Sequence, residues 1–203
     1  IKMEIERNHE FFEKVSNKKI TFRRFVPPLL TKLNIEDKSL KNYIVISPGA
    51  SSQNKCWPIF NFQNLILEVI KKYKLKIVLC GTKSESTILN SIFNNVDSNL
   101  LEIRIGKSLL EFIEIIRNAD LVIGNNSSSV HIASMVNTKS ICIYGGQIYG
   151  RFFPYPSSFK ISPKVVSNKN CKKENWKCSK FHNCLEKITV KDIIIEVEKI
   201  LTC

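Results

Sequence analysis

Short apolar runs alternate along most of the chain with longer stretches whose apolar positions recur at helical spacing. The run at 43–47 (YIVIS) is continuous and β-branched, as expected of a strand that is buried on both faces of a sheet. Residues 60–73 instead repeat their apolar positions with the period of an amphipathic helix. The two patterns predict strands at 43–47, 76–80, 101–105, 121–123 and 140–144, and helices at 60–73, 84–93, 108–118, 127–136 and 190–201. This alternation predicts an α/β fold with a parallel sheet and helices on both faces.

Two stretches depart from this alternation. Residues 1–17 are charged and helix-like, and residues 18–42 are irregular, with Pro27 and Pro28 breaking any helix. We therefore expect an interdomain helix and linker at 1–40, followed by one domain at 41–203. Residues 145–187 are predicted to be mostly loop, with a short strand at 165–166. The chain begins with Ile1 rather than Met, which suggests a fragment whose natural start lies upstream.

Composition narrows the class of protein. A 203-residue chain with 43% hydrophobic residues can bury a core, and no apolar run approaches the ~20 residues of a membrane span. Without a signal-peptide core we expect a cytoplasmic protein. The formal net charge of +13 suggests an anionic partner: nucleic acid, an anionic membrane surface or a phosphorylated ligand. Nucleic acid is not expected, because no RNP-like motif, zinc-finger spacing or basic heptad region is present.

Lysines concentrate between Lys160 and Lys180, where seven of them accompany a single acid, Glu174. This segment is either a solvated basic loop or a peripheral contact with anionic lipid of the inner membrane. It also holds Cys171 and Cys178, which with Cys184 form the spacing C-x6-C-x5-C. Structural zinc sites usually pair cysteines two to four residues apart, so we expect reduced thiols or a local disulfide rather than a metal. Among the other cysteines, three lie in or beside apolar segments and are predicted to be buried thiols: Cys56, Cys80 and Cys142.

Ligands bind parallel sheets beyond the carboxyl ends of the strands, which directs attention to the loops 48–57, 124–131 and 145–156. In the first loop Gly49 permits close backbone approach, Ser51 and Ser52 supply donors, and Lys55 offers a positive charge suited to a diphosphate. The alternative for this loop is an ordinary strand-to-helix turn.

The second loop carries polar residues from a strand into a helix, whose free N–H groups suit a phosphate. His131 lies about one turn into that helix and would donate to an oxygen held there. The alternative is simple N-capping by Asn126 or Ser127, with a structural His131. The third loop, with three glycines, four aromatic residues and Arg151, is either a ligand cover or a surface loop.

The order of these segments is more specific than any one of them. P-G-A-[ST]-x-x-x-K-x-W-P after the first strand, L-x-E-x-I-x-x-I-x-x-A-D-L-V-I-G-N-[DN]-[ST]-x-x-x-H and then S-I-C-I-Y-G resemble the C-terminal half of the family 9 glycosyltransferases, the lipopolysaccharide heptosyltransferase-like enzymes. The resemblance covers the whole chain. It implies the Rossmann-like C-terminal lobe of a GT-B glycosyltransferase, which binds a nucleotide-diphosphate sugar and transfers heptose or a related sugar, with inversion, to a lipopolysaccharide or surface-glycan acceptor.

The resemblance also implies roles for individual residues. Ser51, Ser52 and Lys55 would meet the donor diphosphate, Glu85 would lie near the nucleoside, and Lys107 would line the nucleobase or ribose side. The phosphate and the sugar would meet four residues of the second loop: Asn126, Ser127, Ser128 and His131. Neither a metal nor another cofactor is expected; the nucleotide sugar is a substrate.

Two positions depart from the family pattern, since Asn126 stands where Asp is usual and Ser128 where Gly is usual. The catalytic base of the family is an Asp of the N-terminal lobe, which this chain does not contain, so no catalytic residue is assigned. These points favour an alternative, a non-catalytic or degenerate nucleotide-sugar-binding module. A third hypothesis, a nucleotide-sugar epimerase, would need cleft carboxylates, of which the sequence shows no convincing set.

Overall fold

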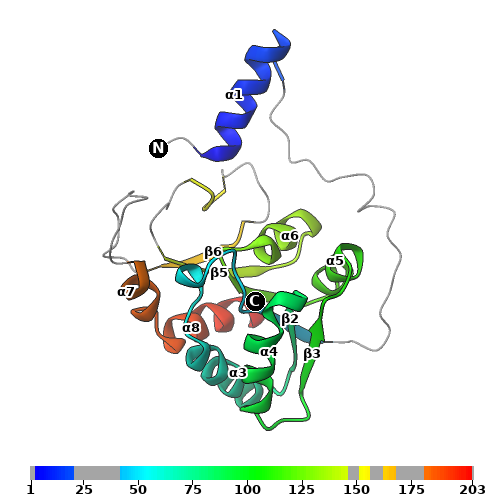
Figure 1. Ribbon diagram of the computed structural model, residues 1–203, viewed down its shortest axis with the longest axis vertical. Coiled ribbons are helices and arrows are strands. Elements are labelled where there is room, and N and C mark those ends of the chain that lie inside the picture. Colours follow the sequence, from blue (N-terminus) through cyan, green and yellow to red (C-terminus); the bar gives the residue numbers. More distant parts are fainter. Residues whose placement is uncertain (1–2, 21–41, 146–150, 156–161, 168–180, 203) are drawn as a thin grey trace.

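The structure is a computed structural model that describes residues 3–20, 42–145, 151–155, 162–167 and 181–202. Its centre is a six-stranded sheet in the order β3-β2-β1-β4-β5-β6, in which every neighbouring pair is parallel (Figure 1). The strands are β1 (Tyr43–Ser47), β2 (Lys76–Gly81), β3 (Leu101–Ile105), β4 (Leu121–Asn125), β5 (Ser140–Tyr144) and β6 (Lys164–Ser167). The predicted parallel, Rossmann-like α/β fold is thereby confirmed, including the short sixth strand.

Alternate residues of each strand enter different cores, because side chains of a strand point to opposite faces. On β1, Ile44 and Ile46 belong to the larger core, whereas Tyr43 and Val45 belong to the smaller one. All five β1 residues are buried, which explains why its sequence is continuously apolar rather than alternating.

Helices cover both faces of the sheet. The larger core is closed by α3 (Ile59–Tyr73), α4 (Ser86–Asn94) and α8 (Val190–Leu201), and the smaller one by α5 (Leu109–Arg117) and α6 (Ser128–Val136). A capping box begins α5, with Ser108 Oγ accepting from the Glu111 amide at 3.3 Å and the Glu111 carboxylate accepting from the Ser108 amide at 2.9 Å. Two 3-10 turns, η1 (Gln53–Lys55) and η2 (Lys83–Glu85), follow β1 and β2.

One helix was not predicted. Residues 181–186 form α7 (Phe181–Glu186) inside the stretch that was expected to be loop. Leu185 and Ile188, in and just after α7, are buried in the larger core. The Ile188 carbonyl accepts a hydrogen bond of 2.8 Å from Nε1 of the buried Trp57, so this late segment seals the loop that follows β1.

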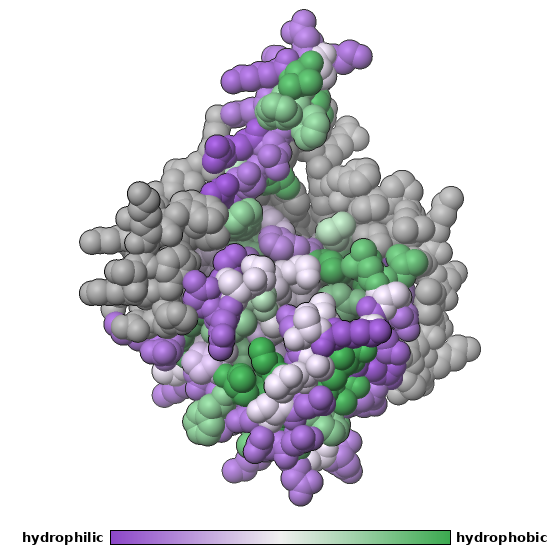
Figure 2. Space-filling view, viewed as in Figure 1, coloured by the Kyte–Doolittle hydropathy of each residue, from purple (hydrophilic) through white to green (hydrophobic). Residues whose placement is uncertain are grey.

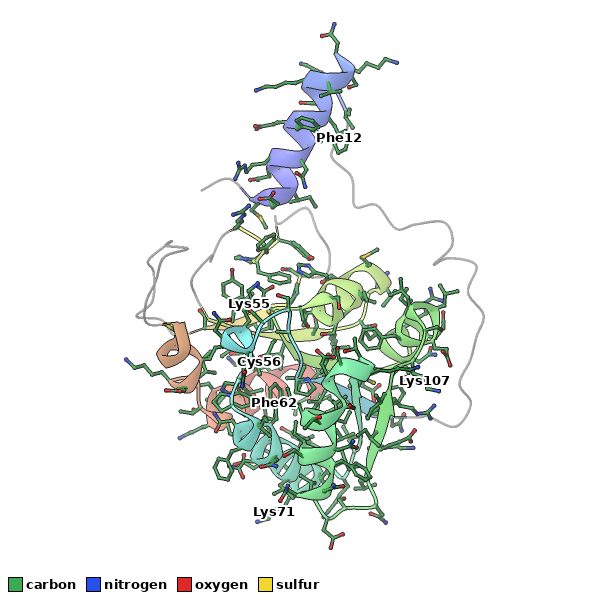
Figure 3. The ribbon with its side chains drawn as sticks, viewed as in Figure 1. Phe12, Lys55, Cys56, Phe62, Lys71 and Lys107 are labelled. Atoms are coloured by element: carbon green, nitrogen blue, oxygen red, sulfur yellow. The ribbon has the colours of Figure 1, made fainter. Side chains whose placement is uncertain are left out.

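The first helix, α1 (Glu4–Ser16), projects from the rest of the fold (Figure 1). It is attached near its start, where the Glu4 amide donates to the Arg151 carbonyl at 2.8 Å and the Arg151 guanidinium pairs with the Glu4 carboxylate at 2.8 Å. Further along, Phe11, Phe12 and Val15 are exposed and give α1 the apolar surface seen in Figure 2; Figure 3 labels Phe12. The linker assigned to 18–40 falls mostly outside the described residues, so the domain boundary stays a prediction.

The predictions for the lysine-rich segment and for the cysteines can be compared with the structure only in part. Of the lysines from Lys160 to Lys180, only Lys164 lies in the described ranges; it is exposed, with Nζ 3.5 Å from the Glu196 carboxylate. Cys80, Cys142 and Cys184 are buried and Cys56 is half-buried, while Cys171 and Cys178 lie outside the described residues. In the described ranges, no helix is long and apolar enough to cross a membrane.

Candidate functional site

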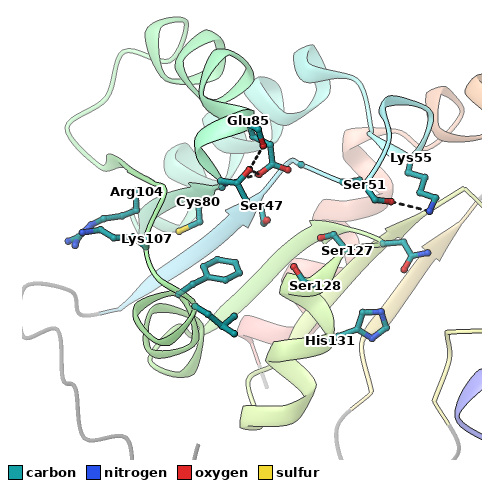
Figure 4. A pocket seen from close by; sticks show the side chains of 18 of the residues that line it. Ser47, Ser51, Lys55, Cys80, Glu85, Arg104, Lys107, Ser127, Ser128 and His131 are labelled. Carbon is teal, nitrogen blue, oxygen red and sulfur yellow. Dashed lines mark hydrogen bonds between the residues drawn. The ribbon is translucent and has the colours of Figure 1, made fainter. Parts of the chain in front are cut away.

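A pocket of about 830 Å³ opens at the carboxyl ends of the central strands. The strand order reverses between β1 and β4, and the loops that follow these two strands both line the pocket. Such a switch point is where open parallel sheets bind ligands, because the diverging loops leave a crevice there. The volume lies in the range of small-molecule sites. Figure 4 shows the pocket from close by.

The loop after β1 places a cation at the pocket. Lys55 lies at the end of η1, is half-buried, and donates from Nζ to Ser51 Oγ at 3.2 Å. Ser51 also lines the pocket, whereas Ser52 does not. Ser52 is exposed, and its carbonyl accepts the Lys55 amide at 3.0 Å, which closes the 3-10 turn. Ser52 therefore supports the loop that carries Lys55.

Glu85 reaches the pocket from η2, after β2. Its Oε2 accepts from the Thr82 amide at 2.7 Å and from Thr82 Oγ1 at 2.8 Å. Its carboxylate also fills the space beside Gly49: a Cβ built on Gly49 would stand 1.7 Å from Oε1. Gly49 is therefore required for the close approach of the first two loops. The close approach of a ligand, which the sequence predicts for this glycine, stays a prediction.

Asn125, the last residue of β4, joins the loop after β1 to β4. It is fully buried; its Oδ1 accepts from the Trp57 amide at 3.0 Å, and its Nδ2 donates to the Pro48 carbonyl at 2.6 Å. Its neighbour Asn126, which was predicted from the sequence, lines the pocket. Asn125 was missed, although a polar residue that ends a buried strand at the switch point is a signal for such a bridge.

The helix α6 begins at the pocket with Ser127 and Ser128 on the lining. Ser127 occupies the N-cap position but its side chain makes no capping hydrogen bond; its Oγ lies 3.0 Å from Ser129 Oγ. Simple capping by Ser127, the alternative for this loop, is therefore not what the structure shows. The first amides of α6 remain available to an anion at the positive end of the helix dipole.

His131 follows one turn later and also lines the pocket. Its ring stacks on Phe153, with centroids 4.4 Å apart and planes 19° apart, and its Nδ1 is hydrogen-bonded to the Tyr155 hydroxyl. Burial lowers the pKa of His131 from 6.5 to about 4, so its imidazole is neutral at pH 7. Phe153 and Tyr155 come from the third loop, whose segment 146–150 lies outside the described residues.

The opposite end of the pocket carries two cations. Arg104, at the end of β3, pairs with Glu102, and Lys107 lies 3.5 Å from the Glu111 carboxylate. In Figure 4, Arg104 and Lys107 lie on the opposite side of the pocket from Lys55. Glu85 lies above the space between them, and the α6 residues lie below it. Cys80 also lines the pocket, but burial raises the pKa of its thiol to about 12, so it is not a thiolate at pH 7.

The pocket thus brings together eight of the nine residues selected from the sequence, all but Ser52. Their roles toward a ligand stay predictions. Phe152, from the third loop, also lines the pocket, as a ligand cover there would require. Arg104 and Thr82 line it too and were not predicted from the sequence, because only the folded sheet brings them there. Among the described residues, no three His, Cys, Asp or Glu side chains are grouped so that they would hold a metal ion.

Comparison with known proteins gives consistent matches. The family model for glycosyltransferase family 9 (heptosyltransferase) matches residues 2–183. The lipopolysaccharide heptosyltransferase 1 of Campylobacter coli is 29% identical over 168 residues, which cover 80% of this chain and 47% of that protein. The chain spans about half the length of such curated relatives.

Solved structures of low sequence identity share the fold. ADP-heptose lipopolysaccharide heptosyltransferase II of Escherichia coli superposes with a TM-score of 0.66 at 20% identity, covering 80% of this chain and 47% of that one. A second E. coli heptosyltransferase, solved with ADP-2-deoxy-2-fluoro heptose, gives a TM-score of 0.68 at 17% identity and covers 96% of this chain and 55% of that one.

Proposed function

The chain belongs to glycosyltransferase family 9, and from that premise we propose that it is the donor-binding portion of a sugar transferase. The donor is a nucleotide-diphosphate sugar, ADP-heptose or a related compound. The acceptor is a lipopolysaccharide or surface-glycan precursor, bound by a second lobe, and the transfer inverts the anomeric centre. The observation that carries the proposal is the pocket at the β1/β4 switch point, where a lysine and an uncapped helix start face the same space.

The charges of the pocket suit a diphosphate. Lys55 comes from the loop after β1, and the N-terminus of α6 comes from the loop after β4, so a bridging diphosphate would contact both. His131 is neutral, and it therefore offers hydrogen bonding without adding charge. The rim with Arg104 and Lys107 leaves room for the nucleoside beside Phe112 and Leu109, which supply apolar surface.

We propose that the general base for the acceptor hydroxyl comes from the acceptor-binding lobe. Inversion requires a carboxylate that accepts this proton. Among the described residues that line the pocket, Glu85 is the single carboxylate, and both of its hydrogen bonds go to Thr82. A carboxylate held as the partner of Thr82 and packed on Gly49 serves structure rather than proton transfer.

Calorimetry with the 203-residue chain tests donor binding. We expect ADP-heptose and ADP to bind, and the Lys55→Ala variant to bind both about tenfold more weakly while its affinity for adenosine is unchanged, because Lys55 meets phosphate and not the nucleoside. Lys71→Ala is the matched control, since Lys71 lies on α3 far from the pocket (Figure 3). Equal losses for ADP and adenosine would place Lys55 away from the diphosphate, and absence of binding to any ADP- or UDP-sugar would refute the proposal.

A non-catalytic nucleotide-sugar-binding module is the second candidate. Asn126 and Ser128, which replace the usual family Asp and Gly, both line the pocket and favour it. Restoring the family residues with Asn126→Asp and Ser128→Gly distinguishes the two. A transferase retains or gains transfer activity when its acceptor-binding lobe is supplied, whereas a binding module binds the donor and transfers nothing.

We also propose that the protein works at the cytoplasmic face of the inner membrane without a metal. The segment from Lys160 to Lys180 would contact anionic lipid, at ~1 kcal/mol for each lysine near the surface. Sedimentation with vesicles that contain anionic lipid, at low and high salt, tests this contact, and binding that ignores the lipid charge would contradict it. EDTA should leave donor binding unchanged.

A further inference from the structure

The imidazole of His131 is held on two sides by the third loop. Phe153 is fully buried with Val130, Cys142 and Tyr144, and it supports one face of the imidazole. The Tyr155 hydroxyl meets one ring nitrogen, Nδ1. The ring is therefore fixed in orientation, and only its other nitrogen, Nε2, is left for the pocket that His131 lines.

The segment that carries Tyr155 is itself anchored, through the backbone amide of Tyr155 and through its ring. The Tyr155 amide donates to Ser162 Oγ at 3.1 Å, and the Phe153 and Tyr155 rings lie 5.1 Å apart. At its start, Arg151 pairs with Glu4 of α1. A contact to His131 built on such a segment is a stable part of the fold rather than a chance approach of a surface side chain.

The contact joins two neutral groups, and the direction of its hydrogen bond follows the tautomer of His131. Burial raises the pKa of Tyr155 to about 12 and lowers that of His131 to about 4, so a protonated phenol faces a neutral imidazole at pH 7. A neutral imidazole has one N–H and one acceptor nitrogen. When the phenol O–H donates a hydrogen bond to Nδ1, Nδ1 is the acceptor nitrogen and the imidazole proton must be on Nε2.

We propose that Tyr155 is a positioning residue that holds His131 as the Nε2–H tautomer, so that the imidazole presents a hydrogen-bond donor to an oxygen of the bound ligand. The inference rests on the proposed function, because the oxygen is a phosphate or sugar oxygen of the nucleotide sugar. In the opposite tautomer Nε2 would turn a lone pair toward that oxygen and repel it. Tyr155 thus acts through His131 and does not itself line the pocket.

The tautomer is measurable in the ligand-free protein. Two-bond ¹H–¹⁵N correlation spectra of the histidine-labelled chain separate protonated from acceptor ring nitrogens. The chain has three histidines, and His131→Gln identifies the signal of His131. We expect an acceptor Nδ1 and a protonated Nε2 in the unmodified chain at pH 7, and mixed tautomers in Tyr155→Phe. A protonated Nδ1, or a spectrum that Tyr155→Phe leaves unchanged, would overturn the inference.

Ligand binding gives the second measurement. Tyr155→Phe should weaken ADP-heptose binding about fivefold, as expected for a hydrogen bond that is weakened rather than removed. Tyr144→Phe is the matched control, because Tyr144 packs on Phe153 in the same cluster and also loses only a hydroxyl. In the His131→Gln background the change at Tyr155 should have no further effect; an equal fivefold loss there would show that Tyr155 acts independently of His131.

The two experiments separate the inference from its premise. If the unmodified chain shows the expected tautomer but binds no nucleotide sugar, the proposed function fails and so does the assigned ligand oxygen. If it binds nucleotide sugar but shows the other tautomer, the role of Tyr155 fails alone. Thermal unfolding of Tyr155→Phe and Tyr144→Phe checks that both variants are folded when they are compared.

Discussion

A methyl group added at Gly49 tests the packing between the first two loops. In Gly49→Ala the new Cβ would lie 1.7 Å from Glu85 Oε1 and 2.3 Å from Glu85 Cδ. The carboxylate must therefore move by more than about 1 Å to reach van der Waals contact. Both of its hydrogen bonds with Thr82, at 2.7 and 2.8 Å, break when it does. Loss of such a cap costs typically ~1 kcal/mol, within a range of about 0.5–2 kcal/mol.

Gly49→Ala also acts on the unfolded chain, and this effect on the free energy of unfolding has the opposite sign. Replacing Gly by Ala at a compatible backbone conformation stabilises a protein by about 0.4–1 kcal/mol, because the unfolded chain loses conformations. Gly49→Ala should therefore destabilise the unmodified protein by about 0.5–1 kcal/mol. In a Glu85→Ala background the carboxylate is gone, and the same change should stabilise by about 0.5 kcal/mol. The sign of the effect changes with the background, and the coupling between the two positions is about 1–1.5 kcal/mol.

Urea denaturation of the four proteins in this cycle measures the coupling through the shift of the unfolding midpoint at constant slope. Gly124→Ala provides the control, because a Cβ there meets Ser129 Oγ at 2.8 Å and the Ser47 carbonyl at 3.1 Å but not Glu85. Its cost should be the same in both backgrounds. Equal effects of Gly49→Ala in the two backgrounds would refute the assigned packing of Glu85 on Gly49.

Three further predictions concern buried polar contacts. The pKa of His131 is about 4 in the folded protein and about 6.5 in the unfolded chain, so the unfolded chain binds a proton first as the pH falls from 7 to 4.5. The free energy of unfolding should therefore fall by about 2–3 kcal/mol more in the unmodified protein than in His131→Gln, as measured by denaturant titration at each pH. Asn125→Asp keeps the acceptor for Trp57 but sets a carboxylate oxygen against the Pro48 carbonyl, and should cost about 2–3 kcal/mol at pH 7; a midpoint equal to that of the unmodified protein would exclude the bridge. Trp57→Phe leaves the Ile188 carbonyl without its donor and removes ring volume, and should lower the free energy of unfolding by about 1–3 kcal/mol, with Trp57→Tyr as the comparison of intermediate size.

The fold was largely accessible from sequence because its four central strands, β1, β2, β4 and β5, are buried on both faces. A strand such as β1 must be continuously apolar, and the helices between the strands must repeat at helical period, so the local pattern carries the architecture. The helix α7 escaped prediction for the converse reason. It has six residues, and what keeps it in place is the burial of Leu185 in the larger core, a contact that no local pattern reveals.

The site was accessible only in part. Loops that follow strands were easy to select, and Lys55 and His131 were found in this way. Asn125 and Tyr155 were not, because each acts through a partner far along the chain: the loop after β1 and His131. Arg104 was not either, because only the assembled sheet brings the end of β3 to the pocket. Residues that line a pocket can be predicted from the topology of the sheet, whereas residues that hold other side chains in position depend on packing contacts between distant segments.

The hydrogen bond between Trp57 and Ile188 has a consequence for the time course of synthesis. It joins residues 131 positions apart, and the Asn125 bridge to Pro48 spans 77. At about 5–20 residues per second, the ribosome needs roughly 10 s to supply the partner of Trp57 after making it. Until β4 has been made, β1 has β2 beside it but an open edge where β4 belongs. The growing chain thus exposes the apolar edge of β1 until β4 has been made. It leaves the larger core partly open for seconds longer, until Leu185, Ile188 and Ile193 arrive to cover it, and this is the interval in which chaperones matter most.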